Sequence, residues 1–134
     1  MLLIIDGQGG GIGRALIEQI KRISPECELT AVGTNSIATS AMLRAGADKG
    51  ATGENAVKVC AARAKIIAGP IGLLMADAML GEITPAMSAA IGASDAHKVL
   101  VPSARCGVQI AGMQTLPPLN SLIEDAAAKI LALV

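Results

Sequence analysis

The sequence predicts an α/β protein of three layers, in which a mostly parallel sheet lies between two layers of helices. Short apolar runs alternate with longer segments of helical period along the chain. A glycine cluster directly follows the first apolar run and leads at once into an amphipathic helix pattern. The chain has 134 residues, which suits a single domain spanning residues 1–134 with one hydrophobic core.

The apolar runs and helical periods then assign each element in order. Strands are predicted over residues 2–5, 28–32, 64–68, 98–101 and 107–111, and the short run 47–51 is compatible with one more. Helices are predicted over residues 12–23, 37–44, 53–63, 73–80, 86–93 and from 118 onward. We expect the first strand to be central in the sheet and the second strand to lie beside it, with right-handed crossovers.

Polar residues and proline mark several helix starts. Asn35 or Ser36 can cap the second helix and Thr52 the third, and Thr84 is followed by a proline at the first helical position of its helix. Only residues 102–106 separate the last two predicted strands, which is too short for a parallel crossover. The pattern therefore predicts an antiparallel strand at the C-terminal edge of the sheet.

The composition excludes several classes of function. The chain contains no Phe, Tyr or Trp, so no ring can stack on a base and no tyrosine can act in catalysis. The net charge is zero at pH 7, and there is no basic tract that would favour nucleic acid or an anionic membrane. Low charge and a high apolar content favour self-association, and we expect a homodimer with two-fold symmetry.

The cysteines and the histidine do not form a metal motif. Cys27, Cys60 and Cys106 are scattered without ligand spacing, and His97 is the one histidine in the sequence. The N-terminal apolar run is short and meets Asp6 immediately, so no secretory signal and no membrane span are predicted. These features together predict a cytoplasmic protein with reduced thiols.

The glycine cluster is the most specific functional signal in the chain. Five of the seven residues from 7 to 13 are glycines, and this segment lies between a predicted strand and a predicted helix. Backbone without side chains can approach a pyrophosphate closely, and the helix that follows presents free N–H groups and a positive dipole end. A glycine-rich turn that binds nothing is the simpler alternative. Residues predicted to bind a nucleotide cofactor here and at two neighbouring strand ends are Gly7, Gln8, Gly9, Gly10, Gly11, Ile12, Gly13, Thr34, Asn35, Gly69 and Pro70.

The spacing of Gly7, Gly11 and Gly13 resembles the cofactor turn of short-chain dehydrogenases over about the first twenty residues. That resemblance implies NAD or NADP as the cofactor, although another adenine nucleotide remains open. Two features depart from that family: its Tyr-x-x-x-Lys motif is impossible without tyrosine, and its usual length is roughly double. The segment is not a P-loop, because no Gly-Lys-Ser/Thr follows the glycines.

Dinucleotide-binding folds commonly have an acidic residue at the end of the second strand, where it binds the ribose. In this sequence the corresponding segment is Gly33-Thr34-Asn35-Ser36, which does not discriminate NAD from NADP.

Weaker candidates lie elsewhere in the chain. The segment 69–72 is either a second ligand turn or a plain strand-to-helix break. Asp77 and Glu82 could form a carboxylate pair, although solvation of both is the simpler expectation. Cys106 beside Arg105 could have a lowered thiol pKa, but no base stands next to it in the sequence.

The whole chain resembles a small bacterial family that is catalogued as a domain of unknown function with a Rossmann-like fold. The resemblance rests on a combination of segments, residues 6–13, 33–42, 50–55, 69–72 and 81–85. It implies the fold and brings no established activity.

Three functions therefore remain open. The first is a nucleotide- or dinucleotide-binding protein that acts as a sensor or regulatory subunit. The second is a small NAD(P)-dependent oxidoreductase or transferase whose site is completed at a dimer interface. The third is a structural oligomer without a ligand, and the sequence does not decide whether the protein is an enzyme.

Overall fold

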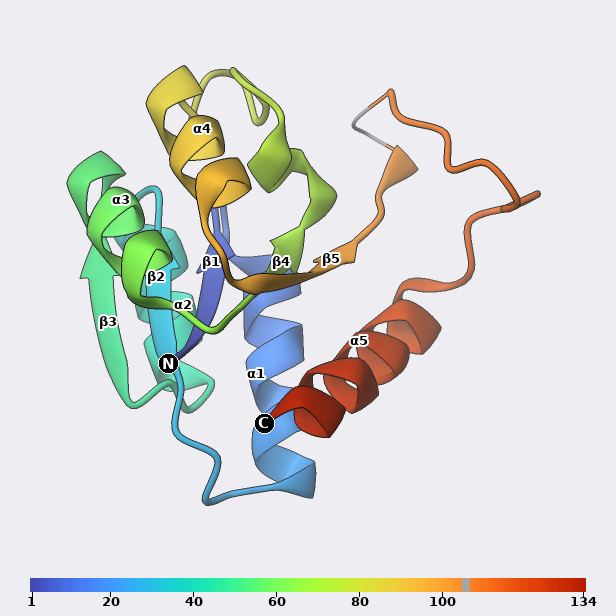
Figure 1. Cartoon of the computed structure of the whole chain (residues 1–134). Coiled ribbons are helices and arrows are strands. Elements are labelled where there is room, and N and C mark those ends of the chain that lie inside the picture. The colour runs from blue at the N-terminus through green and yellow to red at the C-terminus, as the bar shows by residue number, and fades with distance from the viewer. Residues whose placement is uncertain (105–106) are drawn as a thin grey trace.

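The computed structural model of the chain describes residues 1–104 and 107–134. Strands and helices alternate through most of this length (Figure 1). The strands are β1 (Leu2–Asp6), β2 (Thr30–Gly33), β3 (Lys49–Thr52), β4 (Ile66–Pro70) and β5 (His97–Val101). The helices are α1 (Gly11–Ile23), α2 (Ser36–Arg44), α3 (Glu54–Arg63), the short 3₁₀ helix η1 (Ile71–Leu74), α4 (Pro85–Ala93) and α5 (Leu119–Leu133).

The five strands form one parallel sheet in the order β3-β2-β1-β4-β5. Central β1 pairs with β2 through Leu3 and Thr30, and with β4 through Leu3 and Ile67. The predicted placement of the first strand at the centre, with the second beside it, is confirmed. The run at residues 47–51 contributes to β3 and forms one edge.

Helices cover both faces of the sheet, because the side chains of β1 alternate between two apolar clusters. Leu2 and Ile4 pack with Leu16 of α1 and with side chains of α2 and α5 on one face. Leu3 and Ile5 pack on the other face, where α3 and α4 contribute their buried side chains. In Figure 1, α1 and α5 lie on one side of the sheet and α3 and α4 on the other. The predicted three-layer architecture is therefore correct.

Two of the predicted helix caps are present. The Asn35 side chain accepts a hydrogen bond from the Ala38 N–H at 2.9 Å, and the Thr84 hydroxyl accepts one from Met87 N–H at 3.1 Å. Thr52 does not cap α3, because Gly53 stands at that position and the Thr52 hydroxyl bonds the Thr39 hydroxyl instead, at 2.7 Å.

The predicted antiparallel edge strand is wrong. The sheet ends at β5, which runs parallel to β4, and residues 107–111 adopt no strand conformation. In Figure 1, the described residues between Gly107 and α5 lie away from the sheet and lead into α5. Gly107 and Gly112 have positive φ angles of 65° and 88°, which turns the chain where a strand would need extended backbone. Its apolar side chains Val108 and Ile110 stay more than a third exposed, so burial does not favour a strand here.

The predicted helix over residues 73–80 is also wrong. The helical conformation stops with η1 at Leu74, and the chain continues as turns up to α4. Asp77, Met79 and Leu80 have φ angles of 64°, 58° and 56°, which lie outside the right-handed helical region. Ile83 closes this loop, because its carbonyl accepts from Asp77 N–H at 2.7 Å and its side chain is fully buried.

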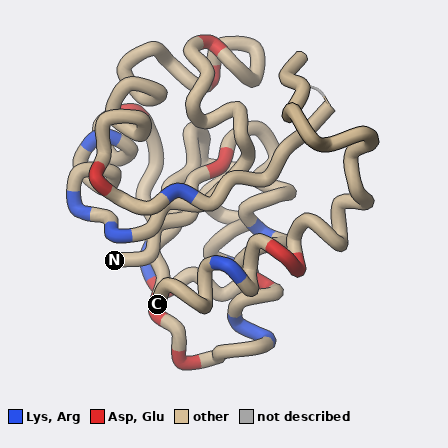
Figure 2. Tube along the Cα trace, turned by 45° about the vertical axis from the view of Figure 1, so that its right-hand side comes forward, with Lys and Arg blue, Asp and Glu red and all other residues tan. Residues whose placement is uncertain are grey.

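Charged side chains of both signs are mixed over the molecule (Figure 2). Lys21 bonds Asp48 at 2.9 Å and so joins α1 to the start of β3. In the described part of the chain, no helix is both long and apolar enough to cross a lipid bilayer.

Candidate functional site

The glycine turn lies where the strand order changes direction. The chain moves from β1 outward to β2 and β3, then crosses back to β4 on the other side of β1. In open parallel sheets a crevice forms at the carboxyl ends of the strands at this point, and ligands bind there. The turn, Thr34 with Asn35, and the end of β4 all reach this edge of the sheet.

The Asp6 side chain, at the end of β1, links the two ends of the glycine turn. It is 4% exposed and accepts hydrogen bonds from Gly7 N–H and Gly13 N–H, each at 2.7 Å. Burial raises the pKa of the Asp6 carboxyl, and the hydrogen bonds from Gly13 and Gly7 oppose that rise. Because Gly10 caps α1 without a side chain, the carboxylate of Asp6 satisfies an N–H group at the start of the helix. Asp6 therefore shapes the turn from the end of β1.

Two glycines of the turn are required by the fold itself. Gly10 has φ of 72°, and a Cβ there would lie 3.0 Å from backbone atoms of Ala38 in α2. A Cβ at Gly13 would lie 2.6 Å from the Met42 sulfur. These glycines allow α1 and α2 to pack closely around the end of β1.

Gly9 and Gly11 behave differently. A Cβ at Gly9 or Gly11 would meet no heavy atom within 4 Å, so open space lies beside both residues. Among the hydrogen bonds of the described residues, none uses the N–H group of Gly9 or of Gly11 as donor. The turn therefore has two backbone donors without a partner among the described residues, and both lie at positions where a side chain would also meet no atom.

Glu82, which the sequence indicated only as a possible partner of Asp77, belongs to this site. Its Oε1 accepts three hydrogen bonds, from Gln8 N–H at 2.8 Å, from the Thr34 hydroxyl at 2.7 Å and from the Asn35 amide at 2.8 Å. The hydrogen bond from Gln8, followed by those from Thr34 and Asn35, lowers the pKa of the Glu82 carboxyl. The expectation that Glu82 is simply solvated is wrong, because a segment distant in sequence brings it to the turn.

Glu82 belongs to residues 75–83, which we call the cover loop. The loop is closed by its own hydrogen bonds, such as Gly81 N–H to the Asp77 carbonyl at 3.0 Å. It lies against the first glycine of the turn, since a Cβ at Gly7 would be 2.7 Å from the Met79 sulfur and 3.3 Å from Glu82 Oε1. The absence of a side chain at Gly7 therefore lets the cover loop approach the turn.

The structure brings most of the predicted site together. Asn35 donates to the Gln8 carbonyl at 2.9 Å, which places the end of β2 directly beside the turn. Gly69 and Pro70 lie within β4 and are buried. A Cβ at Gly69 would lie 2.2 Å from the Ile5 carbonyl oxygen, so the glycine lets β1 and β4 pair closely. This contact favours a packing role for Gly69.

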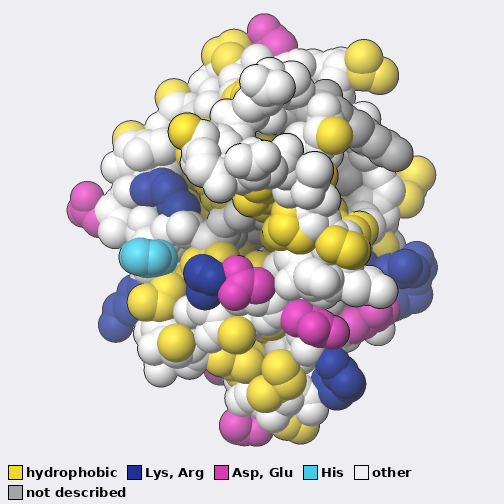
Figure 3. All heavy atoms as spheres, turned by 90° about the vertical axis from the view of Figure 1, so that its right-hand side faces the viewer, with side chains coloured by type: hydrophobic (Ala, Val, Ile, Leu, Met, Phe, Trp, Pro, Cys, Tyr) yellow, Lys and Arg dark blue, Asp and Glu magenta, His cyan; other side chains and the backbone are white. Residues whose placement is uncertain are grey.

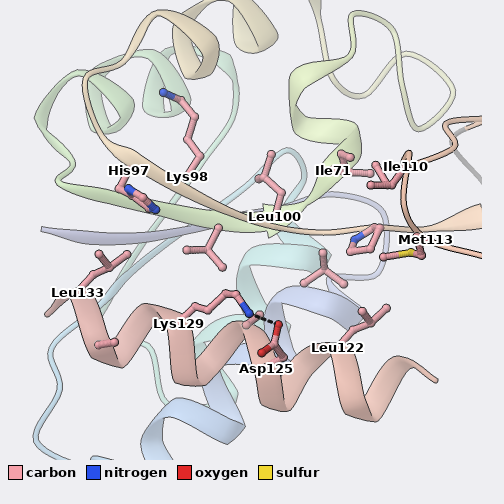
Figure 4. A pocket seen from close by; sticks show the side chains of 15 residues that line it. Ile71, His97, Lys98, Leu100, Ile110, Met113, Leu122, Asp125, Lys129 and Leu133 are labelled. Atoms are coloured by element: carbon pink, nitrogen blue, oxygen red, sulfur yellow. Dashed lines mark hydrogen bonds and ion pairs between the residues drawn. The ribbon is translucent and has the colours of Figure 1, made fainter. Parts of the chain in front are cut away.

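Two cavities lie away from this edge of the sheet. A groove of about 610 Å³ runs between β5 and α5, and hydrophobic side chains gather in this hollow (Figure 3). Side chains from both elements face one another across it, with the ion pair of Asp125 and Lys129 on the α5 side (Figure 4). A second cavity, of about 820 Å³, is lined by residues 102–104, 107–114 and 116. Neither cavity includes the glycine turn.

The remaining candidates add no chemistry to the site. His97 is exposed at the start of β5. Burial raises the pKa of the Cys27 thiol, which makes it a poor nucleophile. Arg105 and Cys106 lie outside the described residues, so the proposed low-pKa thiol stays a prediction. In residues 1–104 and 107–134, no three His, Cys, Asp or Glu side chains are grouped to hold a metal ion.

The parallel sheet, its strand order and the glycine turn after the central strand define a Rossmann-like α/β protein. More particularly, the chain belongs to the family described as a domain of unknown function, DUF3842, whose model matches residues 1–134. No protein in a search of curated proteins matches the chain. A solved structure that is similar to the chain is the dodecameric FMN-dependent Ubix-like decarboxylase from Escherichia coli O157:H7. The likeness covers 98% of this chain and 92% of that one, with a TM-score of 0.52 and 17% identity, and it supports the fold alone.

Proposed function

We propose that this protein binds a nucleotide or dinucleotide at the carboxyl edge of its sheet and acts as a sensor or regulatory subunit. The phosphate groups lie over residues 9–13, and the ribose meets Thr34 and Asn35. The observation that carries the proposal is the pair of unused donors in the turn: the N–H groups of Gly9 and Gly11 bond nothing among the described residues, and a Cβ at either residue would meet no atom within 4 Å. Peptide N–H groups at a helix start are the usual ligands of phosphate oxygens in this fold class.

The residues present fit a phosphate-bearing ligand better than they fit a buried flavin ring. Asp6 is occupied by two N–H donors, so it shapes the turn and does not contact the phosphates. The similar decarboxylase is FMN-dependent by its description, and FMN is itself a phosphate-bearing cofactor. With no aromatic side chain in this sequence, a flavin ring would have to pack between aliphatic groups. NAD and NADP are therefore the first ligands to test, followed by other adenine nucleotides.

The test is calorimetric titration of NAD, NADP, ATP, coenzyme A and FMN into the wild type and Gly11→Val. A branched side chain at residue 11 would fill the open space beside the turn, so we expect Gly11→Val to abolish nucleotide binding. Gly92→Val is the matched control, because Gly92 is also helical with open space around it but lies in α4. Circular dichroism establishes that both variants are folded.

Two results would contradict the proposed function. One is that the folded wild type binds none of these nucleotides. The other is that Gly11→Val binds them as tightly as Gly92→Val does. An ultraviolet absorption spectrum of the purified protein is an independent check, since the chain has no Trp or Tyr to mask a bound nucleotide.

We also propose that the protein assembles as a homodimer. The β5 edge of the sheet and the apolar groove between β5 and α5 provide a surface that a second copy could cover. Size-exclusion chromatography with light scattering at tens of micromolar measures the mass directly. A monomeric mass at that concentration would refute the dimer.

A further inference from the structure

We infer that Glu82 is the acidic acceptor of the ribose site and that it selects nucleotides with an unmodified 2′,3′-diol over those with a 2′-phosphate. The inference rests on the proposed function and makes it specific. It assigns NAD or another adenine nucleotide without a 2′-phosphate as the ligand and excludes NADP. The cover loop thereby becomes a specificity element of the site.

The position of the carboxylate carries the argument. Proteins of this fold class commonly have an acid at the end of the second strand that accepts hydrogen bonds from the ribose hydroxyls. Here β2 ends at Gly33 and is followed by Thr34 and Asn35, which carry no charge. Glu82 lies 2.7 Å from the Thr34 hydroxyl and 2.8 Å from the Asn35 amide, so the cover loop supplies an acid at the same strand end.

The Glu82 carboxylate is held in place through one oxygen, and its other oxygen is available to a ligand. Its three hydrogen bonds all end on Oε1, and Gln8 N–H fixes that oxygen relative to the turn. Within the described residues, no hydrogen bond uses Oε2. A carboxylate oxygen has lone pairs for two hydroxyl donors, which is the pattern that a vicinal diol offers.

Charge decides between the two ligand classes. The hydrogen bonds to Glu82 lower its pKa, so the group is ionised at neutral pH. A 2′-phosphate would place a second anion against this carboxylate, and like-charge contacts at a binding site are strongly unfavourable. Sites that accept the 2′-phosphate use a nearby arginine. No Lys or Arg shares a hydrogen bond with Gln8, Thr34, Asn35 or Glu82 in the part of the chain that the structure describes.

A purely structural role is the competing explanation. Glu82 could serve only to fasten the cover loop to the turn through the same three hydrogen bonds. Glu82→Gln separates the two roles, because the amide oxygen can still accept from the three donors while the negative charge is lost. A structural role affects the affinities for NAD and NADP alike, whereas a selective role changes their ratio.

The experiment compares the Kd values of NAD and NADP by calorimetry for the wild type, Glu82→Gln, Glu82→Asp and Glu54→Gln. We expect the wild type to prefer NAD by at least about tenfold, and Glu82→Gln to lose most of that preference by binding NADP more tightly. Glu82→Asp keeps the charge and should keep the preference for NAD. Glu54 is the matched control, since its carboxylate also accepts a threonine hydroxyl, that of Thr84, but lies on α3. Its variant should leave the ratio unchanged.

The outcomes separate this inference from the proposed function. Equal binding of NAD and NADP by the wild type would overturn the inference and leave nucleotide binding intact. An unchanged ratio in Glu82→Gln would overturn it too. If Glu82→Gln does not fold, Glu82→Asp decides, because loss of the NAD preference in a variant that retains the charge contradicts the charge argument. Binding of neither nucleotide by the folded wild type would overturn both statements.

Discussion

Replacing Gly69 with alanine tests whether the end of β4 serves packing or ligand binding. The added Cβ would lie 2.2 Å from the Ile5 carbonyl oxygen and 2.7 Å from a methyl carbon of Leu73. Ordinary van der Waals contact begins at about 3.4 Å, so the two central strands would have to move apart by more than an ångström. Because the obstructing atom is backbone within a parallel pair, rotation of a side chain cannot relieve the clash.

The expected cost follows from overpacking of a dense core. Extra methylenes in packed interiors cost about 1–3 kcal/mol, and a backbone obstacle places Gly69→Ala at or above the upper end of that range. For a chain of this length, 1 kcal/mol corresponds to about 3–4 °C in Tm. We therefore expect the midpoint of unfolding to fall by about 10 °C or more.

The assay is urea denaturation and thermal melting followed by circular dichroism, since the chain has no Trp or Tyr for fluorescence. Gly92→Ala is the matched control, because a Cβ at this exposed helical position meets nothing within 4 Å. Alanine is the better helix former, so the control should be stabilised by about 0.5–1 kcal/mol. If Gly69→Ala is as stable as the wild type but loses nucleotide binding, the packing argument is refuted and Gly69 belongs to the ligand site.

The remaining predictions concern the polar residues around the turn. Asn35→Ala should destabilise the fold by about 1 kcal/mol through loss of the α2 cap, which denaturation measures. It should also weaken nucleotide binding by about 0.5–1.5 kcal/mol, and unchanged affinity in calorimetry would remove Asn35 from the ribose site. The folded-state pKa of Glu82 lies below its ordinary value of 4.5, so its contribution to stability is present above that pH and is lost as pH falls through the lowered pKa. The stability difference between wild type and Glu82→Gln should therefore shrink on acidification, and a difference that grows on acidification would contradict the assigned bonds. The Asp6 carboxyl is expected to show the opposite pH dependence, because burial raises its pKa. Its contribution to the free energy of unfolding is present below the ordinary pKa and is lost as pH rises through the raised pKa. Replacing Asp6 with Asn should remove this pH-dependent loss.

Local patterns were sufficient for the architecture. The apolar runs at residues 2–5 and 64–68 predicted strands, the first of them central, and alternation with helical periods predicted a mostly parallel sheet with helices on both faces. The caps of α2 and α4 were also predicted, since Asn35 and Thr84 act on N–H groups only three residues away. The glycine turn was predicted as well, because the strand before it and the helix after it are adjacent in the sequence.

Local patterns failed where long-range contacts decide the conformation. The run from residue 73 to residue 80 has helical composition, yet the chain turns there and places Glu82 against Gln8, 74 residues earlier. The segment 107–111 has strand-like composition, but within the described residues it pairs with no strand, and its side chains stay exposed.

By itself, the sequence determined the fold class, the order of most elements and the place of the glycine turn, because each depends on periodicity or on residues close in the chain. Only the tertiary structure decided which glycines serve packing, as at Gly13 and Gly69, and which leave open space, as at Gly9 and Gly11. It also decided that an acid stands at the end of β2, since Glu82 reaches Thr34 from 48 residues away. The spacing of residues along the chain does not predict this contact between Glu82 and Thr34. The contact results from the packing of β1, β2 and the cover loop around one edge of the sheet.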